Sequence, residues 1–390
     1  MTDFDTPLSR NNTQAVKFDA RKAVFGTDEV IPLWVADMDF PAPAAVTEAL
    51  VNRARHPAYG YTLFHESLYQ SLMGWFEHRH NWSIDRSWLM MAPGVVPSLH
   101  AAALAFAQPG EGVIVQPPVY FPFFSAVTQT GRRVIENPLR ERPGGGYEMD
   151  LEHLEVCARD GARVLFLCSP HNPVGRVWTK DELQSVLAIA RRHGLVVISD
   201  EIHCDLVYPD KPRHTVLATL ASEQDQLITT VAPSKTFNIP GLGLSSLVAP
   251  DPAHRAALKK VFDSLHIGQC NPFSVAGFEA AYRQGEAWLD ELMHYLKGNR
   301  DFVAAFVAEY LPDIRLVEPE GTYLLWLDCR ALGLTDDGLK AFFVHDAGVG
   351  MNPGLQFGTG GSGHMRMNIG APQALLEQAL VQIREAYGRL

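Results

Sequence analysis

The stretch APSKTFNIPG at residues 232–241 is the most informative part of this sequence for predicting the fold. It follows an apolar run at residues 227–231 whose β-branched side chains predict a buried strand. A lysine just past such a strand lies on a turn at the sheet edge, where α/β folds bind ligands. An amine held there can form a Schiff base with an aldehyde, and partial burial keeps it nucleophilic. Most lysines after strands are solvated surface charges, so the case for Lys235 depends on its neighbours.

Two other predicted strands end in polar side chains. Residues 164–168 run into the turn SPHNPVG, which presents Asn172, and residues 195–198 run into SDEIH, which presents Asp200. A carboxylate, a carboxamide and an amine then lie at one edge of the sheet. Pyridoxal phosphate needs these groups: an anion against its ring nitrogen, a donor to its phenolic oxygen and a lysine that forms an imine. Their order and spacing resemble the fold-type I pyridoxal-phosphate enzymes over nearly the whole chain.

Strand-like runs alternate with amphipathic helix-like segments up to about residue 285, which predicts an α/β fold with a mostly parallel sheet between helices. The resemblance implies seven strands and a large cofactor-binding domain at residues 49–285. One predicted helix begins with a capping box formed by Thr179 and Glu182. The clearest helices are predicted at residues 96–107, 179–193 and 273–282.

The pattern changes after residue 285, where grouped helices and strands predict a smaller α+β domain at residues 286–390. Residues 1–48 are expected to cross over and join it, as such segments do in the resembled fold. The elements predicted in this part are helices at 287–310 and 335–345, strands at 322–328 and 365–369, and a last helix.

Composition restricts the classes of function. The chain has 390 residues, of which 47% are hydrophobic, enough for a large core and two lobes. Charged residues make up 20% without long runs, which is typical of a folded globular protein. The formal net charge of −11, with no compensating basic stripe, argues against binding to the phosphate backbone of nucleic acids.

The five cysteines are widely spaced and form no C-x-x-C pair, which fits a reducing cytoplasm. The first residues are acidic and polar, unlike a signal peptide. No apolar run approaches the roughly 20 residues that span a bilayer. We therefore expect a soluble cytoplasmic protein with no membrane partner. No metal is expected, because Asp200, His203, Cys204 and Asp205 crowd one segment in no known ligand spacing.

A glycine before a predicted helix offers a place for the cofactor phosphate. Gly94 lets the backbone approach a ligand, and the N–H groups of Val95 and Val96 can point at an anion. The hydroxyl of Ser234 can donate to the same phosphate. An ordinary turn with a helix cap is the alternative, but the position beside Lys235 favours a phosphate site.

The resemblance assigns roles to two residues with ring side chains, Tyr120 and His203. Tyr120 lies in QPPVYFPF, after a strand predicted at 113–115, where the family places an aromatic that stacks on the pyridine ring. The prolines favour a rigid loop here. In a packed strand, by contrast, Tyr120 would be a core residue. His203 falls where many aminotransferases carry a tyrosine that donates to the phenolic oxygen. It either takes that role or lines the site.

Arg366 lies inside a predicted apolar strand. A buried unpaired charge is costly, so this guanidinium needs an anionic partner. A substrate α-carboxylate, gripped in bidentate fashion, is the natural candidate. The family uses an arginine here for that purpose.

Two positions depart from the common aminotransferase pattern. Gly243 stands where an arginine usually binds the phosphate, and Ala232 stands where a serine is common. The phosphate then needs contacts from elsewhere. In the family a tyrosine reaches the phosphate of the neighbouring subunit, and Tyr61 aligns best with it. The resemblance therefore implies a homodimer with shared active sites.

The N-terminal part makes the resemblance more specific. PLWVADMDF at residues 32–40 closely resembles the signature of the MalY/PatB cystathionine β-lyases, as do KFD at 17–19, DEIH at 200–203 and SKTFNI at 234–239. A strand edge with two acids that cap the next turn would explain the polarity of the first stretch alone. The resemblance implies that the substrate is bound by Val35, Ala36, Asn172 and Arg366.

The predicted function is β-elimination from L-cystathionine, a related cysteine thioether or L-cysteine, which yields a thiol, pyruvate and ammonia. The resemblance implies that Lys235 removes the Cα proton of the substrate and that Asp200 keeps the ring nitrogen of the cofactor protonated. Either Lys235 or Tyr120 protonates the leaving thiolate. An aminotransferase acting on a similar amino acid is the nearest alternative. A cofactor-bearing regulatory protein with vestigial lyase activity is the alternative from another class.

Overall fold

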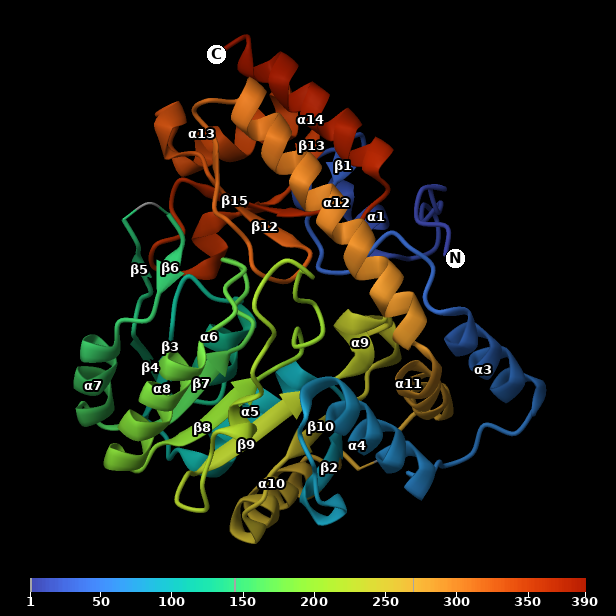
Figure 1. Ribbon diagram of the computed structural model, residues 1–390, viewed down its shortest axis with the longest axis vertical. Coiled ribbons are helices and arrows are strands. Elements are labelled where there is room, and N and C mark those ends of the chain that lie inside the picture. Colours follow the sequence, from blue (N-terminus) through green and yellow to red (C-terminus); the bar gives the residue numbers. More distant parts are fainter. Residues whose placement is uncertain (1, 144, 269) are drawn as a thin grey trace.

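The computed structural model describes residues 2–143, 145–268 and 270–390, and its centre is a seven-stranded sheet (Figure 1). Neighbouring pairs are parallel from β4 to β9, whereas β10 runs antiparallel to both of its neighbours. The mostly parallel sheet that the sequence predicts is therefore confirmed. In spatial order the strands are β2 (Leu89–Ala92), β10 (Ser245–Val248), β9 (Leu227–Val231), β8 (Val196–Asp200), β7 (Ala162–Cys168), β3 (Gly112–Val115) and β4 (Arg133–Glu136).

Both faces of the sheet are covered by helices, because successive side chains of a strand point to opposite faces. On β7, Val164 and Phe166 pack with helices on one face, and Leu165 and Leu167 pack with helices on the other. The first group of helices is α5 (Val95–Phe106), α6 (Pro122–Thr128) and α10 (Pro252–Ser264). The second group is α7 (Leu151–Arg159) and α8 (Lys180–His193). The capping box predicted for α8 is present.

Three more helices pack beside the sheet, where α11 contacts both α3 and α4 (Figure 1). The helices are α3 (Ala44–Arg55), α4 (Glu66–His80) and α11 (Pro272–Gln284). The remaining short elements are α1 (Val16–Asp19), α2 (Arg21–Phe25), α9 (Pro233–Thr236), the β5–β6 hairpin (Arg140–Glu141 and Tyr147–Glu148) and 3-10 turns at Arg86–Trp88, Leu217–Thr219, Pro240–Leu242, Arg330–Leu332 and Gly354–Phe357.

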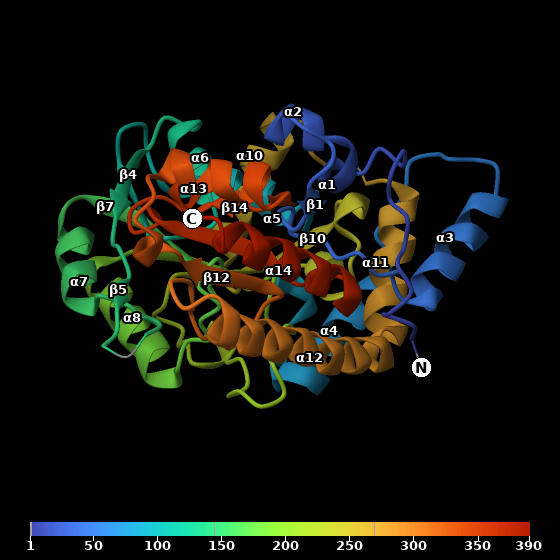
Figure 2. The same cartoon turned by 90° about the horizontal axis from the view of Figure 1, so that it is seen from above.

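The C-terminal part contains a four-stranded antiparallel sheet in the order β11, β12, β15, β14. Helices α12 and α14 lie side by side across it (Figure 2). The helix predicted at 335–345 is α-helical only in its first half and then becomes a π-helix over Phe342–Asp346. The elements are α12 (Glu286–Tyr310), β11 (Arg315–Leu316), β12 (Leu324–Asp328), α13 (Asp336–Ala341), β14 (Asn352–Pro353), β15 (His364–Asn368) and α14 (Gln373–Tyr387).

The N-terminal segment joins this C-terminal part through a short parallel pair. Strand β1 (Ile31–Pro32) is hydrogen-bonded to β13 (Val349–Gly350), more than three hundred residues further along the chain. This pairing agrees with the expected crossover. The division into domains at residues 49–285 and at 1–48 with 286–390 stays a prediction.

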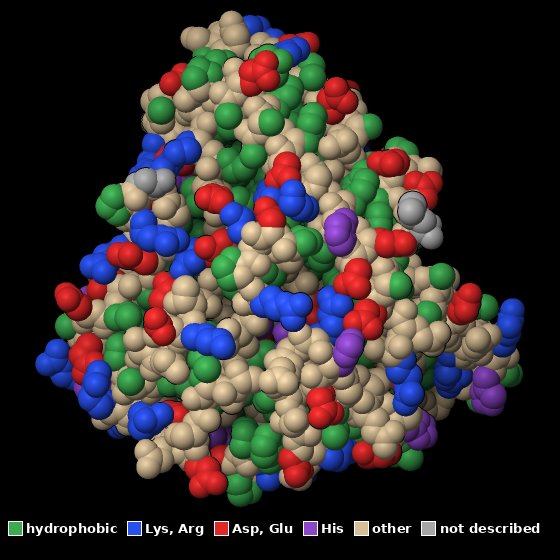
Figure 3. Space-filling view, in the orientation of Figure 1, with side chains coloured by type: hydrophobic (Ala, Val, Ile, Leu, Met, Phe, Trp, Pro, Cys, Tyr) green, Lys and Arg blue, Asp and Glu red, His purple; other side chains and the backbone are tan. Residues whose placement is uncertain are grey.

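The surface is of mixed charge. On the face seen in Figure 3, lysine and arginine side chains are interspersed with acidic ones. Within the described residues, no helix has both the length and the apolar character needed to cross a bilayer. All five cysteines are free thiols.

Candidate active site

The polar residues predicted from the strand ends meet at the carboxyl edge of the parallel strands. Asp200 is the last residue of β8, Asn172 follows β7, and Lys235 follows β9. They line one cavity of about 210 Å³. Other predicted residues in its lining are Ala36, Gly94, Val95, Val96, Tyr120, His203 and Ser234.

Lys235 lies in the short helix α9, not on the turn that we expected. Proline at the first helical position favours this single turn of helix, because its fixed φ suits that position. The amine Nζ donates to the Ala36 carbonyl at 2.6 Å. Burial lowers the pKa of Lys235 to about 8, although the charges of Asp37 and Asp200 oppose this shift. A neutral amine is thus accessible near physiological pH.

Helix α9 is anchored from behind by a buried carboxylate. Asp205 accepts from the Thr236 hydroxyl at 2.9 Å, from His80 Nε2 at 2.8 Å and from the Trp75 indole at 3.1 Å. Cys204, His80 and Asp205 place ligand-type atoms within 4.8 Å of one another. Because the oxygens of Asp205 are already used by three donors, this cluster fixes the residue next to Lys235.

Asp200 is a buried carboxylate whose negative charge is stabilised by few hydrogen bonds. Its Oδ1 accepts from the Ile202 amide at 3.2 Å, and it has no ion pair within the described part of the chain. Burial raises the pKa of Asp200 to about 7. A carboxylate in this state gains most from a partner that brings a proton or a positive charge.

Arg366 is buried without an acidic partner in the described residues. Its guanidinium donates to Asn172 Oδ1 at 3.1 Å, to Asn352 Oδ1 at 2.7 Å and to the Trp34 carbonyl at 3.0 Å, all of which are neutral. Its Nε has no partner, and burial lowers its pKa to about 10. Arg366 does not line the cavity itself but adjoins it through Asn172. This unsatisfied cation can accept an anion.

Helix α5, whose first residues also line the cavity, begins with Gly94 as its N-cap. The first N–H groups of a helix lack intrahelical partners, so Val95 and Val96 offer donors to an anion. A Cβ atom on Gly94 would contact only Pro97, at 3.5 Å, so space remains in front of these donors. The arrangement suits a phosphate group.

The two predicted rings, Tyr120 and His203, both line the cavity. Tyr120 is half-buried, and its amide donates to the Asn172 carbonyl at 3.1 Å. His203 is fully buried, and burial lowers its pKa to about 3, so the imidazole is neutral. Its Nδ1 has no partner in the described residues. Both rings can therefore contact a ligand.

Besides Arg366, two predicted site residues do not line this cavity. The side chain of Tyr61 is 90% exposed, away from the cavity of its own chain. Val35 adjoins the cavity only through Ala36, and its carbonyl accepts from Asn368 Nδ2 at 2.6 Å. The structure of one chain thus brings together all predicted site residues except Tyr61.

The sequence reasoning missed Tyr323, whose hydroxyl donates to the Ala36 carbonyl at 2.9 Å. Its ring stands edge-on to His203 with 6.1 Å between centroids. The preceding Thr322 is buried and has a φ of 68°, an uncommon conformation for a β-branched residue. Inside an apolar strand-like run, the sequence carries no signal for this tyrosine.

From the sequence alone, capping of the next turn is the one role indicated for the acids of residues 32–40. They do not cap a turn, because Asp37 pairs with Arg10 at 2.8 Å and Asp39 pairs with both Arg10 at 2.7 Å and Lys17 at 2.8 Å. Lys17 is completely buried. The KFD and PLWVADMDF stretches are therefore parts of one ion-pair network.

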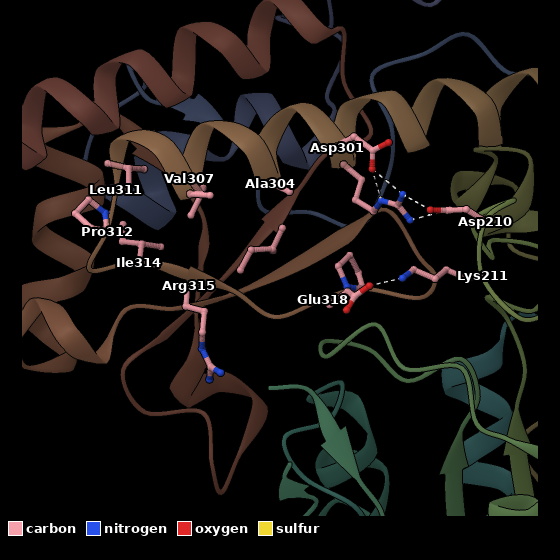
Figure 4. A pocket seen from close by; sticks show the side chains of 14 residues that line it. Asp210, Lys211, Asp301, Ala304, Val307, Leu311, Pro312, Ile314, Arg315 and Glu318 are labelled. Atoms are coloured by element: carbon pink, nitrogen blue, oxygen red, sulfur yellow. Dashed lines mark hydrogen bonds and ion pairs between the residues drawn. The ribbon is translucent and has the colours of Figure 1, made fainter. Parts of the chain in front are cut away.

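A larger cavity of about 580 Å³ lies elsewhere, along α12 and the segment that follows it (Figure 4). Arg300 pairs there with Asp210 at 2.7 Å and with Asp301 at 2.6 Å, and Lys211 pairs with Glu318. The rest of its lining includes apolar side chains such as Val307. Since these charges satisfy one another, the smaller cavity remains the candidate active site.

Comparison with known proteins is consistent along the whole chain. Residues 28–383 match the family described as aminotransferase class I and II. The chain is 41% identical to cystathionine beta-lyase PatB of Bacillus subtilis, over 98% of this chain and 99% of that protein. It is 32% identical to protein MalY of Escherichia coli, over 99% of each. The structure of cystalysin from Treponema denticola, which contains pyridoxal 5'-phosphate, has a TM-score of 0.96 at 36% identity and covers 100% of this chain and 99% of that chain.

Proposed function

The chain belongs to the class I and II aminotransferase family, and we propose that within it this protein is a carbon–sulfur β-lyase that depends on pyridoxal phosphate. Its substrates are L-cystathionine and related cysteine thioethers, or L-cysteine, and its products are a thiol, pyruvate and ammonia. The observation that carries the proposal is the cavity in which Lys235, Asp200 and Asn172 meet, in a chain 41% identical to a cystathionine β-lyase.

The residues present fit the cofactor. Asp200 is a buried carboxylate without an ion pair in the described residues, and the Nδ1 of His203 is buried without a partner there. These groups suit the ring nitrogen and the ring oxygen, respectively. The start of α5 and the hydroxyl of Ser234 would hold the phosphate, and Tyr120 would pack on the ring.

Each residue then has a definite task. When bound, pyridoxal phosphate supplies an aldehyde that links to an amine and a ring that accepts electrons from the substrate Cα. Asp200 would hold a proton on the ring nitrogen, and Arg366 would bind the substrate carboxylate. The amine of Lys235 would take the Cα proton. The β-thiolate leaves with a proton from Lys235 or Tyr120.

The test is to incubate the loaded enzyme with L-cystathionine and to follow pyruvate, free thiol and transfer of the amino group to an added oxo acid. We expect pyruvate and thiol in equal amounts. Dominant amino transfer would instead identify an aminotransferase. Absence of both reactions would favour the regulatory alternative.

Replacement of Arg366 by alanine should raise KM for cystathionine strongly. The guanidinium donates only to neutral acceptors, so the substrate carboxylate would be its charged partner, worth about 1.5–3 kcal/mol, or roughly 10- to 150-fold in KM. Initial-rate kinetics with cystathionine and its carboxamide check this. The carboxamide should lose little further affinity in the variant, and equal discrimination by both proteins would place the carboxylate site elsewhere.

We also propose that the protein is a cytoplasmic homodimer with shared active sites. Five free thiols fit a reducing compartment. The segment between α3 and α4 exposes Tyr59 by 57%, Tyr61 by 90% and Leu63 by 76%. Contiguous exposed apolar side chains are typical of an interface. A twofold axis would then bring Tyr61 to the partner's phosphate site, where Gly243 replaces the usual arginine.

Mixing two inactive variants tests this arrangement. A Tyr61→Ala chain and a Lys235→Ala chain should form mixed dimers with one intact site, because each supplies what the other lacks. Random exchange should restore up to about a quarter of wild-type activity, since half of the dimers are mixed and each has one working site. No recovery despite verified exchange, or a fully active monomer, would disprove shared sites.

A further inference from the structure

The loop that carries Ala36 is held by a side chain three residues after Lys235. Asn238 Oδ1 accepts from the Met38 amide at 2.9 Å, and its Nδ2 donates to the Met38 carbonyl at 2.9 Å and to the Phe40 carbonyl at 2.8 Å. The two stretches that carry the family signature, residues 32–40 and 234–239, are therefore bonded directly to each other.

Position 238 makes two demands that few residues meet together. Its backbone is left-handed, with φ of 55°, a conformation that asparagine and glycine adopt more readily than most residues. Its side chain must both accept and donate. Glycine would suit the backbone but make none of the three bonds, and aspartate could not donate to the two carbonyls.

The loop held in this way covers the reactive amine. Nζ of Lys235 donates to Ala36, two residues before Met38, and Tyr323 donates to the same carbonyl. Burial is the main reason that the pKa of Lys235 is low. The charged and titratable groups around this amine are Asp37, Tyr120, Asp200, His203, Tyr323 and Arg366.

The C-terminal part of the chain also holds this loop. Asn368 Nδ2 donates to the Val35 carbonyl at 2.6 Å and to the Asp37 carbonyl at 2.7 Å, and the Asp39 amide donates to the Gly370 carbonyl at 2.7 Å. Asn238, just after the helix that carries Lys235, thus adds three hydrogen bonds to the one that Lys235 itself makes with this loop.

We propose that Asn238 is a positioning residue for the reaction: it fixes residues 36–40 over Lys235, so that the Ala36 carbonyl holds the free amine and the loop excludes water from it. The proposal rests on the proposed function, because the freed amine must take a proton from the substrate. It adds the requirement that residues 36–40 be held in place, beyond the roles given to the residues that line the cavity.

The Asn238→Gly variant removes the hydrogen-bonding side chain but keeps a residue that readily adopts the left-handed backbone conformation. A matched control exists in Asn81, which has a φ of 52° at the end of α4 and an exposed side chain. Asn81→Gly makes the same chemical change in the same backbone conformation, far from the candidate site. Any effect of added backbone freedom is common to the two variants.

We expect three changes in the loaded Asn238→Gly enzyme and none in Asn81→Gly. Hydrogen exchange of the Met38 amide should accelerate at least about tenfold, because its acceptor is gone. The kcat for β-elimination should fall about tenfold or more, as misplaced catalytic groups cause. The acid limb of the kcat–pH profile should move up by about half a unit or more, because a better hydrated ammonium gives up its proton at higher pH.

An Asn238→Gly enzyme that loses thermal stability but keeps the wild-type acid limb would reduce Asn238 to a structural residue and overturn the proposal. If this variant does not fold, Asn238→Asp is used instead: it keeps the acceptor for Met38, so exchange of that amide should stay slow, and it loses both donors, so an unchanged kcat would overturn the proposal. A wild-type enzyme without β-elimination would contradict the proposed function, whereas an active wild type with an unmoved acid limb in the variant contradicts only the role of Asn238.

Discussion

Replacement of Lys235 by alanine is expected to abolish covalent attachment of pyridoxal phosphate and nearly all β-elimination. In the proposed mechanism the amine links to the cofactor, and it is also the base that takes the Cα proton. Loss of a positioned base alone costs about 10²- to 10⁴-fold in rate. Within the described residues, Lys235 is the only lysine that lines the cavity, so no second lysine there can replace it. Pyruvate release by the purified variant measures this loss.

The attachment site can be checked separately. Borohydride reduction of the loaded wild-type enzyme, followed by peptide mapping, should mark the peptide that contains Lys235. Lys259→Ala is a suitable control, because that lysine is exposed and pairs only with Asp263 within its own helix. A label on any other lysine would show that the central residue has been assigned wrongly.

Replacement of Asp200 by asparagine is expected to leave the cofactor site formed but to lower kcat by about 100-fold or more, since a neutral amide cannot hold the proton on the ring nitrogen as a carboxylate does. The substitution keeps the shape of the side chain and removes its charge. Single-turnover measurements with cystathionine test this on the chemical step. An unchanged elimination rate would exclude the role given to Asp200.

The same variant has a second effect that does not depend on turnover. Burial raises the pKa of Asp200 from 3.8 to about 7, so the folded cofactor-free protein keeps a proton that the unfolded chain releases. The raised pKa means that its contribution to stability is fully present below pH 3.8 and is lost as pH rises through about 7. Asp200→Asn should remove this part of the pH dependence in denaturant titrations at pH 5 and pH 8.

Much of the fold could be predicted because its signals are local. Strand β9 coincides with the apolar run at residues 227–231, and the capping box marks the start of α8. The parallel sheet follows from alternating strands and helices, and a parallel sheet places its strand ends together. The family resemblance drawn from residues 32–40 is likewise confirmed, by the 41% identity to PatB.

The contacts that hold the site could not be predicted in the same way. Asn238, Asn368 and Tyr323 act on backbone carbonyls that lie 198 to 333 residues away in the sequence. A carbonyl has no residue type, so no pattern of side chains marks it as a partner. Helix α9 was missed for a local reason, since four residues are too few to show a helical period.

The pairing of residues 31–40 with residues 349–370 has a consequence for how the enzyme is made. The ribosome releases the N-terminal loop first, yet β13, Asn368 and Gly370 are synthesised more than three hundred residues later. Contacts between distant parts of a chain form late, and domains tend to fold as they emerge. The central sheet can therefore assemble while Lys235 is still uncovered. The amine becomes shielded only after residues 349–370 have been synthesised, and a chain that stops before them would expose that amine and the loop that should cover it.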